Sequence, residues 1–129
     1  MGIYQKPGFW RSLNQAWRGM LYTVKTQKHV QFHLVAGFSV LLFAWYCEVT
    51  QFEWMILIFA IGSVISAEVM NSAVEIVVDM VQPNFHPLAG MAKDVAAGAV
   101  LVTAIQAVVI GIFVFAPLLL RFTSRMFSG

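Results

Sequence analysis

Charged residues are scarce in this sequence. Asp, Glu, Lys and Arg make up 11% of the 129 residues, whereas soluble domains carry about 25%. Hydrophobic residues reach 60%, which is more apolar surface than a soluble fold of this length can bury. We therefore expect a single domain, residues 1–129, that is embedded in a lipid bilayer. The formal net charge of +2 is too small to indicate a nucleic-acid partner.

Other absences exclude several kinds of functional site. The single cysteine, Cys47, excludes an internal disulfide and gives no metal cluster. The sequence has neither a glycine-rich Walker loop nor the motif set of protein kinases, so any kinase chemistry requires a different scaffold. The N-terminal segment lacks the apolar stretch and small-residue cleavage site of a signal peptide, and we expect it to be retained.

Residues 9–28 predict a surface helix. Apolar residues recur at helical spacing from Phe9 to Val24, and the opposite face carries polar and basic side chains, including Arg11, Gln15 and Arg18. An amphipathic helix with a basic polar face is typical of helices that lie in the membrane interface.

Three apolar stretches follow, and they predict transmembrane helices at residues 32–50, 54–81 and 91–122. In the first, the uncharged part from Leu34 to Cys47 has 14 residues, fewer than the roughly 20 of a spanning helix, so its flanks have to contribute. Residues 82–90 contain two prolines and one glycine and predict a loop. The expected fold is all-α, an integral membrane bundle of three transmembrane helices with an N-terminal interfacial helix.

The distribution of Lys and Arg predicts the orientation. Five of the eight basic residues precede the first span, while the segment after it carries Glu48 and Glu53 and no basic residue. By the positive-inside rule, the N-terminus and the 82–90 loop lie in the cytoplasm, and Arg121 and Arg125 lie outside. Small residues within the spans allow close helix packing, and we expect a homo-oligomer.

Four polar residues of the second span carry the strongest functional signal: Glu68, Asn71, Glu75 and Asp79. Their spacings of 3, 4 and 4 place them on one helix face, within an arc of about 80°. Glu68 lies about 21 Å along the helix from Trp54, near the inner boundary of a hydrocarbon core about 30 Å thick. Charge at that depth usually marks function. Solvation at a helix end, or hydrogen bonding between helices, is the alternative explanation.

Further polar residues flank the loop. Lys93 and Asp94 open the third span, where a helix N-terminus and a lysine attract phosphate, although Lys93 also suits a positive-inside anchor. His86, between two prolines, is suited to stack on or hydrogen-bond a base. Together with the acidic face, these residues suit phosphoryl transfer to a lipid hydroxyl with Mg²⁺. His29 and His33 lie at the inner interface, and the sequence assigns them no role.

The run from Ala67 to Asp79, AEVMNSAVEIVVD, resembles the signature of the prokaryotic diacylglycerol kinase and undecaprenol kinase family. The segment from His86 to Leu101, HPLAGMAKDVAAGAVL, is similar to the same family, and the likeness covers nearly the whole chain. The resemblance implies a homotrimer in the bacterial cytoplasmic membrane, with active sites on the cytoplasmic side shared between subunits. It also implies Mg²⁺-dependent transfer of the γ-phosphate of ATP to a lipid alcohol.

The resemblance further implies roles for individual residues. Glu68 is expected to be the general base on the lipid hydroxyl, and Glu75 a metal ligand that also contacts ATP. The other residues expected to bind ATP are Arg11, Gln15, Asn71, Asp79, Asn84, Phe85, His86, Lys93 and Asp94. Gln31 and Ala97 are expected, with Glu68, to contact the lipid substrate.

One departure from the family pattern concerns the metal. Many members carry a glutamate before the first span as a second ligand, whereas this sequence has Gln27, whose amide oxygen brings no charge. Gln31 stands at a basic position of the same segment.

The loop from Pro83 to Ala89 is more similar to the undecaprenol branch, so we expect undecaprenol as the substrate, with diacylglycerol as the other candidate. Two other classes remain open, a small oligomeric cation or proton channel and a structural membrane subunit.

Overall fold

The computed structural model describes residues 8–127, and it describes side chains as far as residue 120. This part of the chain forms the helices α1 (Phe9–Thr26), α2 (Lys28–Tyr46), α3 (Gln51–Val81) and α4 (Pro87–Phe127). Three of them, α2, α3 and α4 as far as Leu120, are long and apolar enough to cross a membrane. The predicted all-α membrane fold is confirmed over the described residues.

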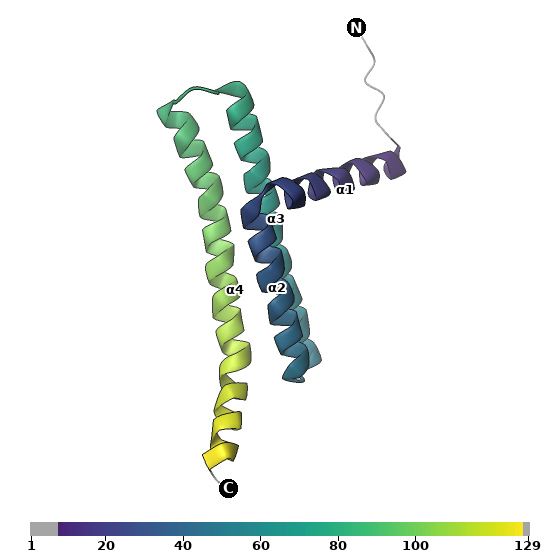
Figure 1. Ribbon diagram of the computed structural model, residues 1–129, viewed down its shortest axis with the longest axis vertical. Coiled ribbons are helices and arrows are strands. Elements are labelled where there is room, and N and C mark those ends of the chain that lie inside the picture. The colour runs from purple at the N-terminus through teal and green to yellow at the C-terminus, as the bar shows by residue number, and fades with distance from the viewer. Residues whose placement is uncertain (1–7, 128–129) are drawn as a thin grey trace.

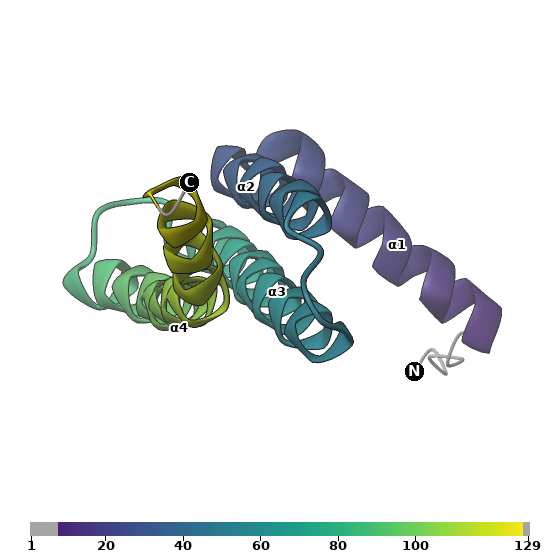
Figure 2. The same cartoon turned by 90° about the horizontal axis from the view of Figure 1, so that it is seen from below.

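The helix α3 is the centre of the bundle. It packs against both α2 and α4, and the three helices run along the long axis of the molecule (Figure 1). Seen from below, α3 is bordered by α2 and by α4 (Figure 2). The helix α1 projects sideways from the start of α2, which is the arrangement expected of a helix that lies in the membrane surface.

The starts of α3 and α4 differ from the predicted boundaries. The helix α3 begins at Gln51, before the predicted residue 54, because Thr50 and Glu53 form a capping box. In it, the Thr50 backbone N–H donates to Glu53 Oε2 at 2.7 Å, and the Glu53 N–H donates to Thr50 Oγ1 at 3.3 Å. The helix α4 begins at Pro87 rather than at residue 91, since proline suits the first helical position. The loop is therefore residues 82–86.

The junction between α1 and α2 also differs from the prediction. The surface helix ends at Thr26, not at residue 28, and the first membrane helix begins at Lys28, not at residue 32. Gln27 between them has an extended backbone, with φ −102° and ψ 110°, which ends one helix before the next begins. Gln31 supports this turn, because its Nε2 donates to the Val24 carbonyl at 2.9 Å.

Close packing of α2 on α3 depends on Gly37. A Cβ atom at Gly37 would lie 2.8 Å from Cγ2 of Ile61, and the β-branched side chain of Ile61 is stiff. We expect Gly37→Ala to destabilise the protein by about 1–3 kcal/mol through overpacking, seen as a lower midpoint of thermal unfolding in detergent. Gly19→Ala is the control, because its Cβ would meet no atom within 4 Å. Equal effects of the two substitutions would contradict the prediction.

Candidate active site

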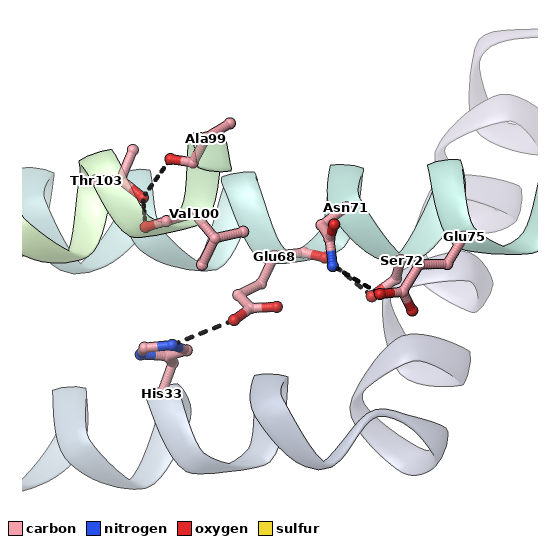
Figure 3. Close-up of polar contacts among 8 residues, drawn as sticks. All are labelled: His33, Glu68, Asn71, Ser72, Glu75, Ala99, Val100 and Thr103. Carbon is pink, nitrogen blue, oxygen red and sulfur yellow. Dashed lines mark hydrogen bonds and ion pairs between the residues drawn. The ribbon is translucent and has the colours of Figure 1, made fainter. Parts of the chain in front are cut away.

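Polar side chains lie along α3 where the sequence places them, and Figure 3 draws three of the four, Glu68, Asn71 and Glu75. Glu68 and Asn71 are buried, with 5% and 9% of their surface exposed, whereas Glu75 is half-buried and Asp79 is exposed. Asn71 Nδ2 donates to Glu75 Oε1 at 3.1 Å, and the Ser72 hydroxyl donates to the Glu68 carbonyl at 2.9 Å. These side chains therefore run from a buried carboxylate to an exposed one along a single helix.

The Glu68 carboxylate is paired with a histidine from another helix. Its Oε1 atom lies 3.2 Å from Nε2 of His33 on α2 (Figure 3). A buried carboxylate costs several kcal/mol unless a partner compensates it, and His33 provides that partner. The sequence assigned no role to His33, because residue spacing predicts contacts within one helix only. His33 and Glu68 lie on two helices, and the turn that joins these helices is at the other end of α2 from His33.

One atom of Asn71 has no partner. Its Oδ1 is buried and accepts no hydrogen bond from the described residues, which costs about 1–3 kcal/mol. Because Nδ2 of the same amide bonds to Glu75, an amide oxygen and a carboxylate lie close together, and Mg²⁺ prefers oxygen ligands of this kind. No group of three or more His, Cys, Asp and Glu residues is placed to hold a metal within the described range. A metal here needs further oxygens from phosphate or water.

A second polar cluster surrounds the 82–86 loop. Lys93 Nζ pairs with Asp79 Oδ1 at 2.5 Å, which joins the start of α4 to the end of α3. The backbone N–H of Leu88 donates to His86 Nδ1 at 3.2 Å, so His86 also caps the start of α4. A cavity of about 220 Å³ lies in this cluster. Its lining residues are Val78, Asp79, Gln82, Pro83, Asn84, Phe85, His86, Ala89, Gly90 and Lys93.

An apolar groove of about 320 Å³ runs between α2, α3 and α4. Gly37 and Val40 line it from α2, Leu57 from α3 and Phe115 from α4. His33 is the one polar side chain among its lining residues, so the groove leads to the histidine that pairs with Glu68. A groove of this lining suits a hydrocarbon chain.

Six other predicted site residues make no polar contact with Glu68 or Glu75 within the described part of one chain. They are Arg11 and Gln15 on α1, Gln27 and Gln31 at the α1–α2 junction, and Asp94 and Ala97 on α4. The N-terminal half of α1 extends away from α3 (Figure 1), and the Gln31 amide is bonded to α1 backbone carbonyls. In the described part of the chain, no hydrogen bond or ion pair joins these six residues to Glu68 or Glu75.

Comparison with known proteins places most of the chain in one family. The sequence model of the family "Prokaryotic diacylglycerol kinase" matches residues 14–115. The undecaprenol kinase of Bacillus subtilis (strain 168) is 41% identical over 109 residues, which cover 84% of this chain and 89% of that protein. A diacylglycerol kinase of Synechocystis sp. is 37% identical over 106 residues, covering 81% of this chain and 61% of that protein.

The diacylglycerol kinase of Escherichia coli (strain K12) is 31% identical over 105 residues, which cover 79% of this chain and 86% of that protein. The range matched by the family model includes both His33 and Glu68, all of α2 and α3, and most of α4. The chain therefore belongs to the prokaryotic diacylglycerol kinase family and is a multi-pass membrane lipid kinase.

Proposed function

We propose that this lipid kinase transfers the γ-phosphate of ATP to undecaprenol, with Mg²⁺, on the cytoplasmic side of the bacterial plasma membrane. The observation that carries the proposal is the position of Glu68, which is a buried carboxylate paired with His33, a residue that lines an apolar groove. Among the described residues, it is the one acidic side chain that is buried. A lipid kinase needs a base at the depth of the lipid hydroxyl, and Glu68 is suited to that role.

In this proposal, the hydrocarbon chain of the lipid lies in the groove and its hydroxyl meets Glu68. The carboxylate takes the hydroxyl proton while the lipid oxygen bonds to the γ-phosphorus of ATP and the bond to the ADP oxygen breaks. A positioned general base typically contributes about 10²- to 10⁴-fold to the rate. Gln31 and Ala97 are the further residues proposed to contact the lipid.

The polar face beyond Glu68 is proposed to bind the nucleotide. Glu75 and the free Oδ1 of Asn71 would hold Mg²⁺, because both are hard oxygen donors, and Gln27 would add an amide oxygen. When held by these residues, Mg²⁺ would supply positive charge against the charge that develops on the phosphates. Lys93 brings positive charge to the phosphates, and its partner Asp79 keeps that side chain in place. Asp94 is a further proposed ATP contact on α4.

The loop is proposed to hold the nucleoside. Phe85 is 93% exposed, which leaves its ring free to stack on a base, and Asn84 and His86 line the same cavity. Aromatic stacking on a nucleobase typically contributes about 1–3 kcal/mol.

We further propose that the enzyme is a homotrimer whose active sites are shared between subunits. Support comes from the six predicted site residues that make no polar contact with Glu68 or Glu75 within the described part of one chain. Two of them, Arg11 and Gln15, belong to the N-terminal half of α1, which extends away from α3. A neighbouring subunit can supply such residues to the acidic face of α3. The exposed apolar surface of the three membrane helices is available to surrounding membrane lipids and to other subunits.

Two observations favour undecaprenol over diacylglycerol. The loop sequence Pro83–Ala89 resembles the undecaprenol branch, and the undecaprenol kinase of Bacillus subtilis is 41% identical to this chain, compared with 37% and 31% for two diacylglycerol kinases. The alternatives of a channel or a structural subunit are not retained, because the chain belongs to an enzyme family.

The proposal is tested by transfer of labelled γ-phosphate from ATP in detergent micelles. Undecaprenol and diacylglycerol are supplied in separate reactions, each with Mg²⁺ and with the metal removed by a chelator. We expect label in undecaprenol, a lower rate with diacylglycerol, and no label without Mg²⁺. Faster labelling of diacylglycerol would assign the other substrate, and equal labelling without metal would contradict the role of Mg²⁺.

A Gln27→Glu variant is the control for a weak metal site. If the wild-type protein labels neither lipid but the variant labels one, the kinase assignment holds and Gln27 limits metal binding. Folded protein that labels neither lipid in either form would contradict the proposed function.

A further inference from the structure

We infer that His33 is a positioning residue, whose Nε2 atom holds the Glu68 carboxylate in the orientation needed to receive the lipid proton. The inference rests on the proposed function, in which Glu68 is the general base. It is carried by the contact between His33 Nε2 and Glu68 Oε1 at 3.2 Å (Figure 3). His33 therefore acts on the reaction through Glu68.

The surroundings leave Glu68 dependent on this one contact. The carboxylate is buried, and His33 is the one side chain paired with it in the described part of the chain. With Oε1 directed to His33, the other oxygen, Oε2, is left to accept the lipid hydroxyl. Among the described residues, α3 contributes a hydrogen bond to the backbone carbonyl of Glu68, from Ser72, and His33 remains the side chain paired with the carboxylate itself.

The packing of α2 on α3 fixes the position of His33. Gly37 lies one helical turn from His33, and its close approach to Ile61 leaves no room for a Cβ. The imidazole also packs edge-on against Phe32, with ring centroids 5.3 Å apart and an interplanar angle of 75°. A ring held by backbone packing and by an aromatic neighbour is a rigid support for a flexible glutamate.

The first test compares His33→Leu with His33→Gln in the lipid phosphorylation assay. Leucine removes the hydrogen-bond donor, so we expect kcat to fall on the order of 10-fold to 100-fold, the effect of losing a hydrogen bond to a charged group. The KM for ATP should stay unchanged, because the proposed nucleotide contacts lie elsewhere. Glutamine keeps an amide N–H at similar reach and should restore most of the turnover.

His29→Leu is the matched control, because His29 is an exposed histidine near the start of the same helix, and its turnover should equal that of the wild type. Wild-type turnover in His33→Leu would overturn the inference. If His33→Leu fails to fold, as judged by thermal unfolding, the test rests on His33→Gln. A folded glutamine variant whose kcat is as low as that expected for the leucine variant would also overturn the inference.

The second test is a double-mutant cycle with Glu68→Asp, whose shorter side chain withdraws from His33. If His33 acts through Glu68, adding His33→Leu to Glu68→Asp should lower kcat far less than it does alone. An equal loss in both backgrounds would show that His33 acts independently and would overturn the inference. Full turnover of Glu68→Gln would instead contradict the proposed base itself, which distinguishes the two failures.

Discussion

Glu68→Gln is expected to lower the turnover of lipid phosphorylation by about 10²- to 10⁴-fold, the usual contribution of a general base. Glutamine has nearly the same shape and can still accept a hydrogen bond from His33, but it cannot take up the hydroxyl proton. Because the proposed nucleotide contacts lie further along α3 and around the 82–86 loop, ATP binding should persist. Phosphoryl transfer to undecaprenol and binding of a fluorescent ATP analogue, measured on the same preparation, check both parts.

The matched control for this substitution is Glu48→Gln. Glu48 is an exposed carboxylate in the turn between α2 and α3, at the opposite end of α3 from the 82–86 loop. The same chemical change there should leave turnover at the wild-type value. Wild-type turnover in Glu68→Gln would remove Glu68 from the role of base, whereas loss of ATP binding in that variant would assign Glu68 to the nucleotide site.

Glu75→Gln is expected to weaken Mg²⁺-dependent binding of ATP on the order of 10-fold to 100-fold. Loss of a group that only orients a metal ligand typically lowers metal affinity by about this factor, so loss of the ligand's charge should lower it at least as much. The substitution removes a full negative charge next to the free Oδ1 of Asn71, where the hard oxygen donors lie. Glutamine can still accept the hydrogen bond from Asn71 Nδ2, so the local fold of α3 should be kept. Titration of ATP binding with and without Mg²⁺ measures the effect.

The control measurement for Glu75→Gln is nucleotide binding in the absence of metal. There the variant and the wild type should differ far less in ATP binding than with Mg²⁺ present, because most of the effect of the substitution acts through the ion. A variant that binds Mg²⁺ and ATP with wild-type affinity would contradict the proposed metal ligand. A variant that loses metal-free binding to the same extent would indicate a direct contact between Glu75 and the nucleotide instead.

The two substitutions are expected to separate chemistry from binding. Loss of kcat with unchanged ATP affinity in Glu68→Gln assigns that carboxylate to the transition state, and a raised KM for ATP in Glu75→Gln assigns the other to ground-state binding. The two carboxylates share one helix face but differ in exposure, since Glu68 is buried and Glu75 is half-buried. In the proposed mechanism, the lipid and the nucleotide would therefore approach the same helix from different environments.

Helix periodicity and composition were sufficient to predict much of this protein. The number and type of the membrane helices follow from the length of the apolar stretches. The polar face of α3 follows from the spacing of Glu68, Asn71, Glu75 and Asp79, because residues three and four apart share a side of any α-helix. The predicted helix boundaries at residues 28, 32, 54 and 91 differ from the observed ones, since boundaries depend on local backbone bonds and on caps.

The contact between His33 and Glu68 was decided by the tertiary structure alone. The two residues lie on different helices, and no periodicity predicts the height at which α2 crosses α3. That height depends on the close approach of Gly37 to Ile61, where a single added Cβ atom would separate the helices. The sequence by itself determined which side chains each helix presents, because a helix repeats locally. Only packing between helices decided which of them meet, because that choice depends on shape across residues distant in the chain.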